Sequence, residues 1–170
     1  MDLSELIDLL AGMADLAGET EGLSELDHGL QCAHELAVVR PADHELQVAG
    51  LCHDIGHQFG PDQDHGRLGA EQVRGLLGDR VASLVEAHVP AKRYLVYSEG
   101  SYRSELSEVS KISLMVQGGP MTPEEASEFE SEPWCADALV LRRADESAKV
   151  PRRSVPGLDV WVPVLEAVAR

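Results

Sequence analysis

The sequence predicts an all-α fold. Apolar residues recur at helical spacing along most of the 170 residues, and no stretch shows the alternation that a half-buried strand requires. With 44% hydrophobic residues, the chain can bury one substantial core but is short for two. We therefore expect a single helical domain over residues 1–170, a bundle with its motif-bearing core at about residues 21–150.

Five helices are expected in the N-terminal half. Apolar residues recur over residues 3–13, and Gly18 ends that segment. Ser24 and Asp27 form a capping-box pattern that opens the second helix. The others are expected from Pro41 and Asp43 to His53, from about His65 to Leu77 after a polar loop, and from Asp79 to His88.

The C-terminal half has clear helix boundaries. Pro90 is expected to break the preceding helix, and residues 98–101 have the composition of a surface loop. Thr122 followed by Pro123 is a strong helix start, since proline fits the first helical position. Further helices are expected over residues 107–117, from Pro133 through Asp145, and over residues 159–168.

Charge and composition exclude some classes of partner. The net charge of -16 disfavours nucleic acid and anionic membranes, which attract clustered Lys and Arg. Nine of the 14 basic residues nevertheless fall between Lys92 and Arg153, where an anionic small molecule could bind. The three cysteines form no paired motif, and no signal peptide or membrane-spanning run is present, so we expect a cytoplasmic protein.

All seven histidines lie between residues 28 and 88, which indicates a metal site. His53 and Asp54 adjoin at the expected end of a buried helix, where an imidazole and a carboxylate can serve one metal and the carboxylate can span a second. Asp145 would share a buried helix face with Leu141, and a buried carboxylate needs a partner or an ion.

The remaining histidines divide by position. His28, His65 and His88 occur at helix ends or apolar-to-polar boundaries, which suits inward-pointing ligands. His34 lies off the face of His28 and His44 starts a solvated helix, so both are assigned to ordinary packing or surface roles.

These residues resemble the H, HD, D ligand pattern of the HD-domain superfamily of helical metalloenzymes. The chain most resembles its mixed-valent diiron oxygenases, relatives of myo-inositol oxygenase that cleave the carbon–phosphorus bond of 1-hydroxyphosphonates. The motifs that carry the resemblance lie at residues 24–31, 51–57, 88–95, 113–121 and 137–145.

The resemblance implies two iron ions as cofactors. His28, His53, Asp54 and Asp145 would hold one iron, and Asp54, His65 and His88 the other, with Asp54 as the bridge. It also implies that an organophosphonate and O2 are the reactants and that the phosphonate is held by His57, Lys92, Ser110 and Arg142. A guanidinium, an ammonium and neutral donors suit such a dianion.

One departure concerns the organic end of the substrate. Family members that act on 2-aminoethyl substrates have a Tyr-x-Gly-Glu segment near the substrate; here Glu21 keeps the glutamate position, Gly18 replaces the tyrosine, and Glu25 replaces a usual glutamine. Losing the ring would open space, and Glu21 could pair with a cationic amine or be an exposed acid. The sequence therefore does not identify the organic group of the substrate.

Three functions follow from the sequence. The first is an iron-dependent oxygenase that produces a carboxylic acid and inorganic phosphate. The second is an HD-type phosphohydrolase, in which metals activate water against a phosphate ester. The third is a non-catalytic binding module, which the filled set of ligand positions disfavours. The segment from Gln117 to Pro120 and the Leu141-Arg142-Arg143 run favour the oxygenase.

Overall fold

A computed structural model describes residues 1–18 and 20–170. The described chain is helical and contains no strand, which confirms the all-α prediction. The α-helices are α1 (Leu3–Gly12), α2 (Glu25–Val39), α3 (His44–Cys52), α4 (His65–Ser98), α5 (Tyr102–Glu105), α6 (Glu108–Val116), α7 (Pro123–Ser131), α8 (Cys135–Ser147) and α9 (Leu158–Val168).

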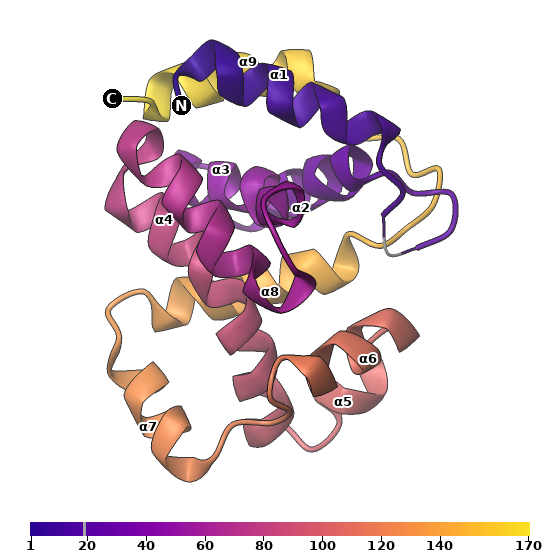
Figure 1. The fold of residues 1–170 in the computed structure, drawn as a ribbon, viewed down its shortest axis with the longest axis vertical. Helices are drawn as coiled ribbons and strands as arrows, with labels where there is room; N and C mark the ends of the chain where they lie inside the picture. Colours follow the sequence, from indigo (N-terminus) through magenta and orange to yellow (C-terminus); the bar gives the residue numbers. More distant parts are fainter. Residues whose placement is uncertain (19) are drawn as a thin grey trace.

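The centre of the molecule is the antiparallel pair α2 and α3, which other helices enclose. Helices α4 and α8 pack against this pair and against each other, whereas α1 and α9 cover another side, as Figure 1 shows. The two termini therefore lie near each other. This enclosure explains why α3 is buried along almost its whole length, from Leu46 to Cys52.

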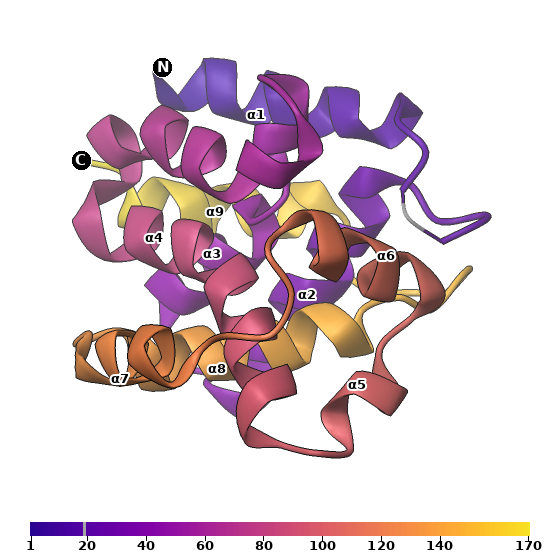
Figure 2. The same ribbon diagram turned by 60° about the horizontal axis from the view of Figure 1, so that its bottom comes forward.

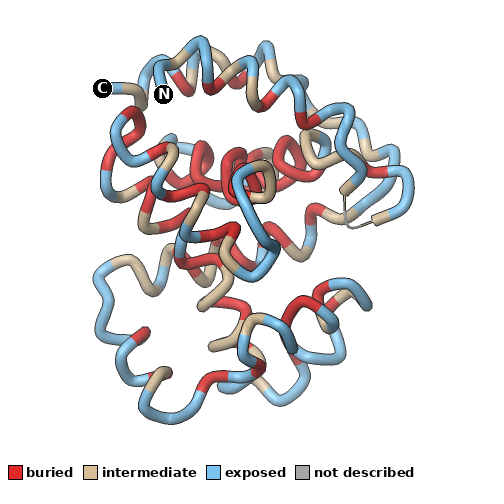
Figure 3. Tube along the Cα trace, viewed as in Figure 1, coloured by how far each residue is buried: buried red, intermediate tan, exposed pale blue. Residues whose placement is uncertain are grey.

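The buried residues are concentrated where α2, α3, α4 and α8 meet (Figure 3). Leu36, Leu51, Leu77 and Leu141 come from these four helices, and each is at most 1% exposed. Buried leucines of this kind supply most of the stabilisation of a helical core, because each removes a large apolar area from water. No described helix is both long and apolar enough to cross a membrane.

Helix α4 differs from the sequence prediction. It continues through Pro90 to Ser98, so the expected break at Pro90 is wrong. Proline removes one backbone hydrogen bond, but buried Ala91, Lys92 and Leu95 hold the next turns against the protein. The predicted boundary after residue 77 corresponds to Gly78, whose φ of 85° kinks the helix.

The other boundaries agree more closely. Ser24 caps α2, and Thr122 forms a capping box with Glu125 in front of α7. The first helix ends at Gly12, before the predicted stop at Gly18. The short helix α5 was not predicted.

Helices α5, α6 and α7 form a smaller layer beside the C-terminal half of α4. Figure 2 shows α6 above α5, on the opposite side of the view from α7. Leu95 of α4, Tyr102 of α5 and Leu114 of α6 are buried together with Leu106 in a separate small cluster. The layer has little core of its own, so its position depends on α4 and α8.

Close backbone packing fixes the segment after α3 against α4. A Cβ at Gly56 would lie 1.8 Å from the carbonyl oxygen of His65. Because backbone rather than a flexible side chain blocks this space, Gly56→Ala should lower the free energy of unfolding by about 3 kcal/mol. Urea unfolding followed by circular dichroism measures the change.

Gly75→Ala is the matched control, because nothing lies within 4 Å of a Cβ there and the glycine is helical and exposed. It should raise the free energy of unfolding by up to about 1 kcal/mol through helix propensity. Equal stability of the Gly56→Ala variant and the unchanged protein would contradict the packing argument.

Candidate metal centre

Six predicted ligand residues converge in the core from four regions of the chain. His28 is in the first turn of α2, His53 and Asp54 follow the end of α3, His65 and His88 belong to α4, and Asp145 belongs to α8. None is more than 9% exposed. Side chains this polar are rarely so buried unless they are paired or bind an ion.

Asp54 faces two groups of histidines, one with each oxygen. Its Oδ2 lies 3.4 Å from His28 Nε2 and 3.1 Å from His53 Nε2. Its Oδ1 lies 3.4 Å from His65 Nε2 and 3.5 Å from His88 Nε2. This arrangement suits a carboxylate that bridges two cations.

Asp145 completes the first group. Its Oδ1 is 3.2 Å from His28 Nε2 and 3.7 Å from His53 Nε2. Potential ligand atoms of His28, His53 and Asp145 all lie within 4.8 Å of one another, as do those of Asp54, His57 and His65. His88 also belongs to the second group by geometry, because its Nε2 is 2.8 Å from that of His65.

The four predicted histidine ligands share one orientation. Each Nδ1 contacts a backbone carbonyl oxygen, at distances of 2.5–3.2 Å: His28 with Ala148, His53 with Gly50, His65 with Asp62 and His88 with Val85. A carbonyl only accepts, so Nδ1 must donate its proton and the neutral ring presents a lone pair on Nε2. Such second contacts typically orient histidine ligands of metals.

The facing Nε2 atoms then need a cation. His28 and His53 approach to 3.2 Å, and His65 and His88 to 2.8 Å. Although burial opposes the shift, Asp145 and Asp54 raise the pKa of His28 to about 9, and they raise that of His53 well above its ordinary value, so a metal ion bound to this pair replaces a proton. Two acceptors at these distances repel unless a proton or a metal ion lies between them. The donor set of imidazoles and carboxylates fits a first-row transition metal in each group.

The electrostatics keep the carboxylates ionised. Burial alone would raise the pKa of Asp54, but His53 and His28 hold it well below its ordinary value. Burial also opposes the shift at Asp145, where Arg142 and Lys149 keep the pKa well below normal. Burial lowers the pKa of His65, and burial with His65 and His53 lowers that of His88 well below normal, which favours the neutral, metal-binding form.

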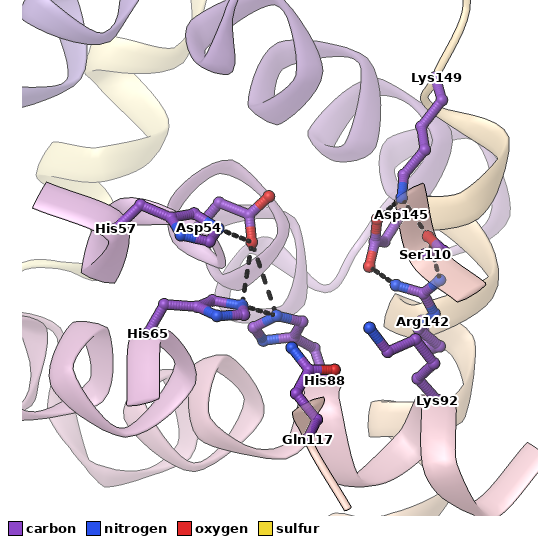
Figure 4. A pocket seen from close by; sticks show the side chains of 10 residues that line it. All are labelled: Asp54, His57, His65, His88, Lys92, Ser110, Gln117, Arg142, Asp145 and Lys149. Carbon is purple, nitrogen blue, oxygen red and sulfur yellow. Dashed lines mark hydrogen bonds and ion pairs between the residues drawn. The ribbon is translucent and has the colours of Figure 1, made fainter. Parts of the chain in front are cut away.

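A group of cations lies opposite the second histidine group in the same cavity (Figure 4). Arg142 is 2% exposed, donates to Asp145 and Glu146, and its Nε donates to the Tyr102 hydroxyl at 3.1 Å. Lys92 is 4% exposed and donates to Ser113 Oγ at 2.8 Å. Two buried cationic side chains beside the histidine–aspartate cluster suit binding of an anion.

Ser110 and His57 also reach this cavity. Ser110 Oγ lies 3.5 Å from Arg142 Nη2, and His57 stacks on His65 with ring centroids 4.1 Å apart. Four predicted anion-binding residues, His57, Lys92, Ser110 and Arg142, therefore lie around the same cavity.

Sequence reasoning missed Lys149 and Glu146. Lys149 Nζ donates to Ser110 Oγ at 2.7 Å and lines the cavity. Glu146 accepts from Ser107 N at 2.7 Å, from Ser110 Oγ at 3.2 Å and from Arg142. The available signal was the spacing of three or four residues that separates Arg142, Asp145, Glu146 and Lys149.

Gln117 was noted only as part of a motif. Both polar atoms of its amide are buried without a hydrogen-bond partner in the described structure, and the side chain lines the cavity. Buried amides are normally satisfied, so an orphaned one at a cavity wall is a candidate for contact with a ligand.

The predicted role of Glu21 has no support in the geometry. Glu21 is exposed in the turn before α2 and lines neither this inner cavity nor the groove beside it. Glu25, at the position of the usual glutamine, does line the groove. His34 and His44 lie outside both ligand groups, as expected.

The sequence is similar to those of known proteins. The HD domain family matches residues 23–147. A hydroxymethylphosphonate dioxygenase of Gimesia maris is 39% identical, with 83% of this chain and 75% of the relative covered. A glycine-betaine-forming [1-hydroxy-2-(trimethylamino)ethyl]phosphonate dioxygenase of Leisingera caerulea is 34% identical, with 95% and 88% covered.

An uncharacterized protein of Acanthamoeba polyphaga mimivirus is 32% identical, with 88% of this chain and 73% of the relative covered. Extensive matches to two dioxygenases of hydroxyphosphonates, together with the family match across the helices that carry all six candidate ligands, identify the lineage. The chain belongs to the HD-domain family, in its branch of phosphonate oxygenases.

Proposed function

We propose that this protein is an iron-dependent oxygenase that cleaves the carbon–phosphorus bond of a 1-hydroxyalkylphosphonate. The reaction consumes one O2 and yields a carboxylic acid and inorganic phosphate, with one oxygen atom entering each product. The observation that carries the proposal is a single cavity that joins a two-sided histidine–aspartate cluster to a buried group of cations. The named activities of the two dioxygenase relatives support it.

The chain would hold two iron ions through the six converging residues. His28, His53, Asp54 and Asp145 suit one ion, and Asp54, His65 and His88 suit the other. Bound iron would supply the redox chemistry with dioxygen, which protein side chains cannot perform. The Nδ1 contacts fix the orientation of the ligands, and four protein residues in one group and three in the other would leave room for reactants at each ion.

The cations would bind and orient the phosphonate. Arg142 keeps a second N–H on each Nη beyond those given to Asp145 and Glu146, and Lys92 of α4 and Lys149, just after α8, add point charges. Ser110 and His57 can donate neutral or charge-assisted hydrogen bonds. Because Glu146 and Asp145 hold the guanidinium of Arg142, its orientation is set before the substrate binds.

The unpaired amide of Gln117 supports a polar ligand in the same cavity. A substrate oxygen near Gln117 would satisfy a group that is otherwise costly to bury. The enclosing α4, α6 and α8 also keep bulk water away from the anion, which strengthens its attraction to Arg142 and Lys92.

Oxygen dependence separates the oxygenase from a phosphohydrolase. Protein purified and loaded with iron without oxygen should contain about two irons per chain, as expected for a dinuclear site. It should show a mixed-valent diiron signal by electron paramagnetic resonance and release phosphate from 1-hydroxyphosphonates only when O2 is added. Phosphate release that continues without oxygen would favour the hydrolase, and failure to bind metal would favour the binding module.

Asp54→Ala should remove metal from both groups, since each oxygen of this carboxylate faces a different one. We expect loss of most bound iron, measured by mass spectrometry after desalting. Asp8→Ala, at an exposed acid on α1, is the control and should keep its iron. Retention of one full iron by the Asp54→Ala protein would argue against bridging.

Arg142→Ala should impair substrate use more than metal binding. Loss of a buried fork to a dianion should lower kcat/KM by about 100-fold or more, whereas the six ligands remain. Arg143→Ala is the matched control from the next position of α8, because Arg143 is exposed, pairs with Glu99 at the surface and lies over the Tyr102 ring without lining the cavity. Iron content and steady-state phosphate release should be measured together; loss of iron in Arg142→Ala alone would assign Arg142 to metal-site structure.

A further inference from the structure

A second, larger cavity opens beside the metal centre. This tail groove has a volume of about 630 Å³ and lies between the segment before α2, the loop before α4 and one face of α6. The inner cavity holds only about 10 Å³ of free space. A volume of several hundred cubic ångströms is typical of sites for small organic molecules.

Two side chains join the groove to the inner cavity. His57 lines both, with Nε2 3.7 Å from Asp54 Oδ1 and Nδ1 3.3 Å from Asp62 Oδ1. Ser113 lines the groove and accepts a hydrogen bond from Lys92, which lines the inner cavity. A molecule whose head lies among the cations can therefore extend into the groove without crossing the protein core.

The α6 wall of the groove is apolar. Val109, Ile112 and Val116 share one face of α6, and Leu16 adds a fourth aliphatic side chain. All four are at least 39% exposed. Aliphatic side chains exposed together at the entrance to a polar site indicate a surface that an apolar ligand covers.

The other wall is acidic. Glu25 and Asp62 line it, and no lysine or arginine among the described residues does so. The carboxyl group of Glu25 is half-buried and makes no hydrogen bond or ion pair within the described structure, and burial raises its pKa. Such carboxylates attract a cation and repel a second anion.

We infer that the tail groove binds the organic part of the substrate, which is an extended aliphatic chain bearing a cationic amine. The inference rests on the proposed function, because the phosphonate head must occupy the inner cavity. The inner cavity is lined by polar and cationic side chains, so the methylene groups contact the apolar face of α6 and the ammonium lies near Glu25 and Asp62, away from Arg142 and Lys92. Glu25 and Asp62 thus take the role that the sequence assigned to Glu21.

Gly18 belongs to the same design. It lines the groove, and a Cβ there would lie 2.9 Å from the carbonyl oxygen of Leu23. A tyrosine at this position would require a shift of the backbone. Backbone packing at Gly18 therefore disfavours any side chain at this position, and the lack of a side chain leaves the groove open.

Three probes test the inference: hydroxymethylphosphonate, 1-hydroxybutylphosphonate and 4-ammonio-1-hydroxybutylphosphonate. Binding to the iron-loaded protein is measured by calorimetry without oxygen, and phosphate release is measured separately with oxygen. Affinity should rise about tenfold from the first probe to the second, as expected for burial of added methylenes. It should rise severalfold again for the third, because exposed carboxylates attract a cation only modestly.

Two variants locate the effect. Ile112→Trp fills the middle of the α6 wall and should abolish the tenfold preference for the butyl probe, whereas Met115→Trp, exposed on α6 but outside the groove, should retain it. Glu25→Gln should abolish the preference for the ammonium, whereas Glu108→Gln, at an exposed acid of α6, should retain it.

The outcomes separate the two proposals. Equal affinity for all three probes, or unchanged preferences in Ile112→Trp, overturns the groove assignment even if oxygen-dependent phosphate release is observed. Graded affinity that Ile112→Trp abolishes, without any phosphate release, supports the groove and contradicts the oxygenase.

Discussion

The candidate site depends on Asp54, whose two oxygens face different histidine groups. A carboxylate in this position must lie between α2, α3 and α4 at once, and it is held there by the turn that follows α3. Gly56 allows that turn to touch the backbone of α4 at His65. The close approach of helices around the core is therefore also what brings ligands from distant parts of the sequence together.

Helix α8 couples the metal centre to the anion site. Asp145 faces the histidines, and Arg142, one turn earlier, contacts the same carboxylate. Glu146 on the next position holds Arg142 and caps the start of α6 through Ser107. A change in charge at one of these groups must alter the others, because they are buried and little screened by water. If the proposed function is right, α8 links metal binding to anion binding.

The predictable part of the site comes from local patterns. His53 and Asp54 adjoin at a helix end, and His28 and Asp145 fall on buried helical faces, so each could be recognised from its own neighbours. Glu146 could not, because its partners Ser107 and Ser110 are 39 and 36 residues away. Pro90 misled the helix prediction because tertiary packing of α4 outweighs one missing hydrogen bond. Glu25, the first residue of α2, lines the groove, whereas Glu21 in the preceding turn does not, and their positions in the sequence do not distinguish them.

The residues proposed for the chemistry and those proposed for the choice of substrate lie in two different cavities. Ligands and cations come from α2, α3, α4 and α8, where almost every neighbour is buried and substitutions are costly. The groove is walled by the segment before α2 and by α6, whose exposed side chains have room to vary. Relatives named for a one-carbon phosphonate and for a trimethylaminoethyl phosphonate both align with this chain over most of its length. A buried interior beside an exposed outer wall suits one set of ligands to organic groups of different size, because side chains of the wall can change without moving the ligands.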